Sequence, residues 1–188
     1  MATEGKKRHE IVVVGLGGAG VLTVGRQVAL AGSTMYKYVT YYPSYSWQMR
    51  GGSSECSVIL SDEQIHSPIL EQSENMLVLA PHLLKTFVGR VRPGGLVVVG
   101  SLGLDKEVDG KDFRMIVVPQ VEQEAAAIGN LVVANTIMLG AYLQISGALS
   151  PELLEAELDR QFADKKKVLE MNRKAFRRGI ALAGELVQ

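Results

Sequence analysis

Residues 11–20 of this chain read Ile11-Val12-Val13-Val14-Gly15-Leu16-Gly17-Gly18-Ala19-Gly20. The four apolar residues are typical of a buried strand, and glycines at G-x-G-x-x-G spacing allow a sharp turn and a close approach of the backbone to a ligand. The residues from Ala19 to Leu30 then predict a helix, whose free N-terminal N–H groups would open onto that turn. A strand, a glycine turn and a helix in this order form an arrangement that can hold a phosphate.

The charge pattern around the glycine turn also favours an anion. No acidic residue occurs from Ile11 to Ser54, although the 20 acidic and 20 basic residues of the chain balance. Only Arg26, Lys37 and Arg50 carry charge in this stretch. We therefore expect no carboxylate there that would repel a bound phosphate.

The acid that usually accompanies such a turn is missing. Nicotinamide and flavin dinucleotide sites place Asp or Glu about 20 residues after the glycines, at the end of the second strand, where it binds ribose hydroxyls. The strand expected at Met35–Tyr42 contains no acid, although Lys37 could serve an NADP site. Two alternatives to a phosphate site stay open: a dinucleotide site without its acid, and glycines that only allow the helix to pack closely on the strand.

Composition limits the class of protein. With 188 residues and 47% hydrophobic content, residues 1–188 are expected to form one domain. Zero net charge and 6% aromatic residues give no footprint for nucleic-acid binding. The single cysteine, Cys56, can form neither an internal disulfide nor an iron–sulfur or zinc site, and its alternating apolar context predicts a small buried thiol. Neither a secretory signal nor a membrane span is apparent, which predicts a cytoplasmic protein without a membrane partner.

Short apolar runs recur along the chain, with helical or loop segments between them. This rhythm predicts an α/β fold with a Rossmann-like, open and largely parallel sheet flanked by helices. Between the fourth and fifth of these runs, Pro81–Val91 is expected to be a helix, closed by a turn at Arg92–Gly95. The expected strands are Ile11–Val14, Met35–Tyr42, Cys56–Leu60, Asn75–Ala80, Leu96–Gly100 and Met115–Val118.

The C-terminal third is expected to be helical. Leu131–Ile145 has apolar residues at helical spacing, with small residues among them, which predicts a buried helix. Ser150-Pro151 is a helix start, and two amphipathic helices follow as a pair. The basic residues of the last helix would face the acids of the one before it. Such a charged strip is either a solvated face or a docking surface.

The loop expected at residues 43–54 has no apolar periodicity and contains the only tryptophan, Trp47. Tyr45 and Trp47 could stack on a planar ring or anchor a partner protein. We expect the loop and the glycine turn to border one crevice at the carboxyl edge of the sheet. Alternatively, the aromatic residues cap the sheet and Arg50 pairs with Glu55. The possible ligand donors are the guanidinium of Arg50, the backbone of Gly51 and Gly52, and the hydroxyl of Ser44.

Several short motifs follow one another along the chain: Gly15-x-Gly17-Gly18-x-Gly20, Tyr42-Pro43-Ser44-Tyr45, Arg50-Gly51-Gly52, Ser67-Pro68, Pro93-Gly94-Gly95, Gly129-Asn130, and Asn135 with Leu139-Gly140. In this order and spacing they resemble, nearly end to end, the gamma subunit of the 2-oxoacid:ferredoxin oxidoreductases. One departure is Ala19, where that family often has Gln, so a side-chain amide contact in the glycine turn is lost.

The resemblance implies a subunit of an enzyme that converts a 2-oxoacid and CoA to acyl-CoA and CO2 while reducing ferredoxin or another acceptor. Thiamine diphosphate, its Mg and the [4Fe-4S] clusters would lie in partners, namely thiamine-binding alpha and beta subunits and a ferredoxin-like subunit. No catalytic residue is expected in this chain, which would be inactive alone.

The gamma subunit of the family would contribute assembly and part of the CoA site. Tyr45 and Trp47, together with parts of the last two helices, are expected at or near interfaces with partner subunits. A stand-alone dinucleotide-binding oxidoreductase domain is the alternative, although the missing acid and the absence of a substrate domain favour the gamma subunit. The expected CoA-binding residues are Gly15, Gly17, Gly18, Ala19, Gly20, Ser44, Arg50, Gly51, Gly52 and Asn135.

Overall fold

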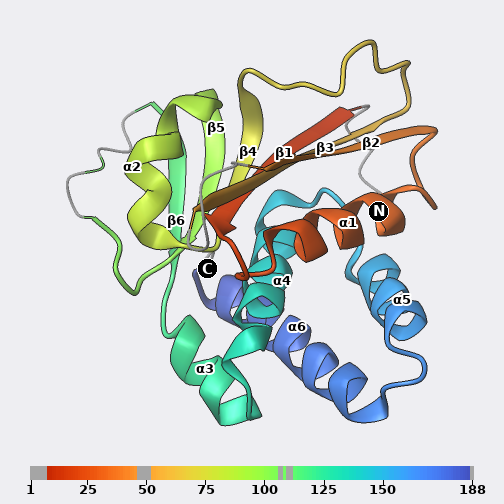
Figure 1. The fold of residues 1–188 in the computed structure, drawn as a ribbon, viewed down its shortest axis with the longest axis vertical. Coiled ribbons are helices and arrows are strands. Elements are labelled where there is room, and N and C mark those ends of the chain that lie inside the picture. The colour runs from red at the N-terminus through yellow and green to blue at the C-terminus, as the bar shows by residue number, and fades with distance from the viewer. Residues whose placement is uncertain (1–7, 46–51, 106–107, 109–111, 187–188) are drawn as a thin grey trace.

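The computed structural model describes residues 8–45, 52–105, 108 and 112–186. Its centre is a six-stranded sheet with the order β2-β3-β1-β4-β5-β6 (Figure 1). Strands β1, β4, β5 and β6 pair in parallel, whereas β3 is antiparallel to both β1 and β2. The predicted open, largely parallel sheet is confirmed. The strands are β1 Arg8–Leu16, β2 Tyr38–Tyr45, β3 Ser53–Ser61, β4 Ser73–Val78, β5 Val91–Gly100 and β6 Arg114–Val118.

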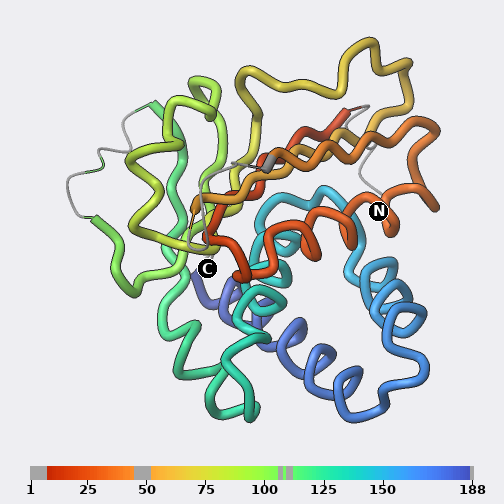
Figure 2. The backbone as a smooth tube through the Cα atoms, in the orientation of Figure 1, coloured from red at the N-terminus to blue at the C-terminus, as the bar shows by residue number. Residues whose placement is uncertain are grey.

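The larger helices cover one face of this sheet. The C-terminal pair α5 and α6, drawn in blue, lies on the same side as α1 (Figure 2). Alternate residues of β1 point to opposite faces, so Ile11 and Val13 join the helix-side core, whereas Val12 and Val14 join a smaller core on the other face. The larger helices are α1 Val21–Gly32, α3 Val121–Ile128, α4 Ala134–Ser146, α5 Pro151–Gln161 and α6 Lys166–Leu186.

The smaller core is covered by short elements. The helix expected at Pro81–Val91 is instead three short pieces: η1 Pro81–Leu83, α2 Leu84–Phe87 and η2 Val88–Arg90. Leu84 is fully buried and packs against the outer face of β1 and β4. Thr86, Phe87 and Gly89 are weak helix formers, which is consistent with the break.

The turn expected at Arg92–Gly95 lies inside β5. Gly94 adopts a left-handed φ of +77°, and the pairing of β4 with β5 shifts register between Ser73 and Asn75. At Gly95, a Cβ atom would lie 2.7 Å from the carbonyl oxygen of Glu74. The glycines therefore form an irregularity within a longer strand, where one backbone passes close to another.

The helix expected at Leu131–Ile145 begins with a 3-10 turn, η3 Leu131–Val133, and continues as α4. Helices α4 and α6 pack tightly, because a Cβ at Gly140 would lie 2.2 Å from Phe176 O and one at Gly179 would lie 1.9 Å from Ile137 O. The expected charged strip is present, since Arg173 binds Asp159 and Arg177 binds Glu155 across α5 and α6. Among the described helices, none has the length and apolar character needed to cross a membrane.

Candidate functional site

The chain leaves β1 and β4, which are adjacent parallel strands, in opposite directions. After β1 it runs through α1 to β2 on one side, and after β4 it runs through α2 to β5 on the other. Such a divergence leaves a crevice outside the carboxyl ends of the two strands, the usual ligand position in open α/β sheets. A pocket of about 300 Å³ lies there. It is lined by Gly18, Ala19, Val78, Leu79, Pro81, Gly100, Val121, Glu122, Leu131, Val132, Ala134, Asn135 and Met138.

The glycine turn forms one wall of this pocket, although its glycines have different tasks. Gly15 is buried, and a Cβ there would lie 2.8 Å from Val21 Cγ2, so this residue serves the packing of α1 on β1. Gly18 and Gly20 have left-handed φ values of +90° and +84°. Of the predicted turn residues, Gly18 and Ala19 reach the pocket. Gly15 therefore allows α1 to pack closely on β1, and a ligand contact stays a prediction for every residue of the turn.

The loop after β2 does meet the glycine turn. The Gly17 N–H donates to Gly52 O at 3.0 Å, as expected if both border one crevice. That bond, and the one from Ala19 N–H to Leu16 O at 3.0 Å, occupies two backbone donors that were expected to face a ligand. These two N–H groups are therefore not available to a bound anion.

The loop is shorter than expected. Strand β2 continues to Tyr45 and β3 begins at Ser53, because the two strands form a hairpin in which Ser44 lies opposite Glu55. Ser44 is exposed and does not line the pocket. Trp47, Arg50 and Gly51 lie outside the described residues, as does the side chain of Tyr45, so their expected roles stay predictions. The carboxylate of Glu55 is bound by Arg90 at 2.8 Å.

Two helices begin at the pocket. Ala19 lies just before α1, and Val121 and Glu122 open α3. Their first N–H groups and positive partial charge favour a ligand with negative charge. Helix α4 also borders the pocket through Ala134 and Asn135, but it continues from η3, and the Ala134 N–H donates to Leu131 O. The meeting of two helix starts in one crevice depends on how the strands are ordered, so the sequence indicated only the first of them.

Asn135 is the predicted residue that the structure places most clearly in the site. It lines the pocket, and its Nδ2 atom would lie 1.9 Å from a Cβ at Gly20. The Thr136 hydroxyl contacts Asn135 Oδ1 at 3.1 Å and Asn172 Oδ1 at 2.8 Å. The single hydroxyl hydrogen can serve only one of these two oxygens, and the contact with Asn172 is the shorter. The amide nitrogen of Asn135, a donor, faces the glycine turn at Gly20.

Sequence reasoning missed Glu122, which brings a carboxylate into the pocket wall. Its Oε2 atom is buried and has no hydrogen-bond partner within the described residues. The residue before α3, Gln120, has φ +55° and is the one described non-glycine residue with positive φ. Left-handed backbone at a non-glycine residue is typical of functional sites. The dipeptide Pro119-Gln120 contains no residue that would indicate this conformation from the sequence.

Cys56 does not belong to the site. It is completely buried, and its Sγ lies 3.4 Å from Val21 O under helix α1. Burial, together with the negative charge of Glu55, raises the pKa of the thiol to about 12. The prediction of a small buried thiol is confirmed.

Apolar residues form the mouth of the pocket. Leu131 and Val132, on η3, are 61% and 71% exposed, although both line the opening. Met138 lies deeper and is nearly fully buried. The pocket thus combines an apolar rim with a few polar groups, which is usual for cofactor and substrate sites.

Comparison with known proteins assigns the family. The model of the family described as pyruvate ferredoxin/flavodoxin oxidoreductase matches residues 10–182. The ketoisovalerate oxidoreductase subunit VorA of Methanothermobacter thermautotrophicus is 30% identical over 179 residues, which are 95% of this chain. The chain spans only 37% of the length of that relative.

Two solved structures share the fold. A gamma subunit of a keto/oxoacid ferredoxin oxidoreductase from Geobacter sulfurreducens superposes with a TM-score of 0.83 and 27% identity, over 96% of this chain and 99% of that one. The 2-oxoglutarate:ferredoxin oxidoreductase of Magnetococcus marinus, with 2-oxoglutarate, coenzyme A and succinyl-CoA bound, has a TM-score of 0.85 and 25% identity. That match covers 97% of this chain and 32% of the other.

Proposed function

The chain belongs to the pyruvate ferredoxin/flavodoxin oxidoreductase family, and we propose that it is the gamma subunit of a multi-subunit 2-oxoacid oxidoreductase. The complex would convert a 2-oxoacid and CoA to acyl-CoA and CO2 and pass the electrons to ferredoxin or another acceptor. The observation that supports this proposal most strongly is the match to a gamma subunit of such an enzyme, which extends over nearly the full length of both chains.

The redox chemistry is assigned to partner chains. A [4Fe-4S] cluster is usually held by four cysteines, and this chain has only Cys56, which is buried. Thiamine diphosphate with its Mg would lie in the alpha and beta subunits, and the clusters would lie mainly in a ferredoxin-like subunit. The role of this chain is then to complete the assembly and to contribute to CoA binding.

The pocket at the carboxyl edge of the sheet supports the CoA part of the proposal. The starts of α1 and α3 and the Asn135 amide would provide donors for phosphate oxygens, and Arg50, from the adjoining loop, would add a charged fork. Glu122 would repel a phosphate placed beside it, so we assign that end of the pocket to an uncharged part of CoA. The relative from Magnetococcus marinus, which has CoA and succinyl-CoA bound, is consistent with this ligand.

The proposal is tested in the complex reconstituted with its partner subunits. Asn135→Leu replaces the amide donor with an apolar side chain of the same branched shape, and Arg50→Ala removes the charged fork. A hydrogen bond to a charged group contributes about 1.5–3 kcal/mol, so each change should raise the KM for CoA about tenfold or more. The KM for the 2-oxoacid should stay the same. Gln144→Leu, at an exposed position of the same helix α4, is the matched control.

The same experiments distinguish the proposed function from its alternatives. If Asn135→Leu left the CoA constant unchanged while the affinity for the 2-oxoacid fell, the pocket would belong to the substrate route. If instead the isolated chain bound NADH or NADPH and reduced a dye without partners, a stand-alone dinucleotide-binding domain would replace the proposal.

A further inference from the structure

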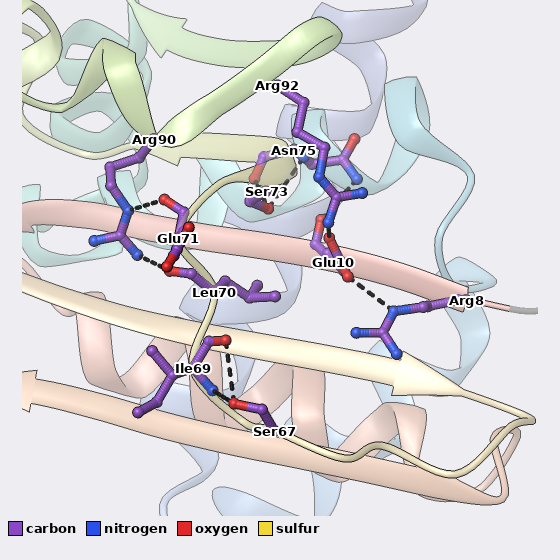
Figure 3. A network of polar contacts seen from close by, with 10 residues as sticks. All are labelled: Arg8, Glu10, Ser67, Ile69, Leu70, Glu71, Ser73, Asn75, Arg90 and Arg92. Carbon is purple, nitrogen blue, oxygen red and sulfur yellow. Dashed lines mark hydrogen bonds and ion pairs between the residues drawn. The ribbon is translucent and has the colours of Figure 1, made fainter.

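A second pocket, of about 520 Å³, lies at the amino-terminal edge of the parallel strands, opposite the first pocket. The starts of β1 and β5 contribute Arg8, Glu10 and Arg92 to its wall. The loop at residues 62–72 closes the other side with His66, Ser67 and Ile69 among others. Figure 3 shows most of these groups together.

The centre of this pocket is a carboxylate held between two arginines. Glu10 is 3% exposed, its Oε1 accepts from Arg8 Nε at 2.8 Å, and its Oε2 accepts from Arg92 Nη2 (Figure 3). Each arginine therefore uses one nitrogen on Glu10. Within the described part of the chain, the other guanidinium nitrogens of Arg8 and Arg92 donate to no protein acceptor.

The charges of this group do not balance. One arginine would neutralise Glu10, and the second has no carboxylate of its own in this group. Glu71, the other acid in the wall, brings the formal charge of the lining to zero, but within the described residues its carboxylate forms no ion pair with either arginine. The ion pair with Glu10 accounts for the charge of one arginine, and the charge of the other is available to an anion.

The opposite wall is fixed in position. Arg90 donates to the carbonyl oxygens of Glu71 at 2.8 Å and Leu70 at 2.6 Å, and it also binds Glu55. The Gln72 amide donates to Gly89 O at 3.1 Å on the neighbouring segment. Leu70, in the same loop, is buried in the smaller core. Because the loop is tied down at several points, the pocket exists without a ligand, and binding would need little ordering of the chain.

We propose that this second pocket binds a small organic phosphate, whose phosphate group bridges the free edges of Arg8 and Arg92. Guanidinium groups are planar forks that match the oxygens of phosphate, and two of them on one side of a pocket suit a doubly charged group. The exposed side chain of Ile69 provides apolar contact for the organic part. The site is independent of CoA binding at the first pocket, which lies at the other edge of the sheet.

The test is a titration of the full-length chain, and binding is monitored through the NMR signals of the arginine Nε–H groups. The signals of Arg8 and Arg92 are identified by their loss in Arg8→Gln and Arg92→Gln. Glycerol 1-phosphate is the organic probe, inorganic phosphate tests whether the phosphate alone is sufficient, and sodium chloride at equal ionic strength controls for screening. We expect glycerol 1-phosphate to shift both signals, with tighter binding than inorganic phosphate and no matching shift in chloride.

Two variants should change the affinity in opposite directions. Arg92→Gln should weaken binding of glycerol 1-phosphate about tenfold, and Glu10→Gln, which removes the competing carboxylate, should strengthen it several-fold. Arg177→Gln, which removes an arginine from an exposed ion pair on α6, is the matched control. Should Arg92→Gln fail to fold, Glu10→Gln alone decides.

The proposal is overturned by chloride shifting the signals as much as the phosphates do, or by Glu10→Gln binding no more tightly than the natural chain. Equal affinity for inorganic phosphate and glycerol 1-phosphate would reject the organic part of the ligand.

Discussion

Gly20 allows the sharp turn into α1 and also leaves space for a side chain of the candidate site. Its φ of +84° places it in the left-handed region at the start of α1, and its missing side chain makes room for the Asn135 amide, whose Nδ2 would lie 1.9 Å from a Cβ. The G-x-G-x-x-G spacing predicted a tight turn here. The neighbour that requires a glycine comes from α4, more than a hundred residues later, and no local pattern could indicate it.

Gly20→Ala should therefore lower the free energy of unfolding by about 1–3 kcal/mol, from backbone strain and the clash with Asn135. Chemical denaturation measures the change. Gly89→Ala is the control, because a Cβ there meets no atom within 4 Å and its φ is not left-handed. Equal stability of the two variants would contradict both the backbone strain at Gly20 and the clash with Asn135.

The thiol of Cys56 should be inert in the folded chain. Burial raises its pKa from 9.0 to about 12, so almost no thiolate exists at pH 8. An aromatic disulfide reagent should label less than a tenth of the chain in the time that labels it completely in urea. Rapid stoichiometric labelling of the native chain would contradict the buried position.

The same pKa makes stability depend on pH. The folded state keeps the proton more tightly than the unfolded state, so the contribution is complete below about pH 9 and is lost as the pH rises toward 12. Cys56→Ala should remove this part of the alkaline loss of stability. Denaturation midpoints between pH 8 and 10.5 in both chains provide the comparison.

At the scale of elements, two glycines set the distance between α4 and α6. Gly140 and Gly179 face each other's backbones, with a Cβ approaching Phe176 O to 2.2 Å and Ile137 O to 1.9 Å. The small residues in the expected helix at Leu131–Ile145 predicted close packing. Its partner was not identifiable, because Gly179 looks like any glycine in an amphipathic helix and ordinarily weakens it.

Gly179→Ala should destabilise the chain by several kcal/mol, because the new methyl group meets backbone that cannot give way. Gly184→Ala, in the same helix, should stabilise it by up to about 1 kcal/mol, since a Cβ there meets nothing within 4 Å and alanine favours helix. Thermal unfolding of both variants tests the opposite signs. A loss of stability in Gly184→Ala similar to that in Gly179→Ala would argue against a specific contact.

At the scale of the whole molecule, the alternation of apolar runs and helices was sufficient to predict the open, largely parallel sheet. It could not predict that β3 runs antiparallel between β1 and β2, since a short buried run carries no direction. The candidate site shows the same division. Gly18, Ala19 and Asn135 were predicted, whereas Glu122 and the apolar mouth come from segments that only the strand order brings together.

Assembly gives the last prediction. Leu131 and Val132 are large, exposed and next to each other at the mouth of the first pocket. In the proposed complex we expect a partner subunit to cover them, because burying an apolar side chain at an interface contributes about 1.5–3 kcal/mol. Replacing both with serine should weaken association with the partner subunits on the order of a hundredfold. The unfolding free energy of the isolated chain should change by less than about 1 kcal/mol, because neither side chain is part of its core.

Association measured by analytical ultracentrifugation with the partner subunits provides the test, and Met35→Ser is the matched control. Met35 is 53% exposed and lies beyond the C-terminal end of α1, outside the residues that line the first pocket. If the double variant assembled normally but bound CoA less tightly, the apolar pair would contact the ligand and not a partner. The interface would then have to lie elsewhere, with Tyr45 and Trp47 as the remaining predicted contacts.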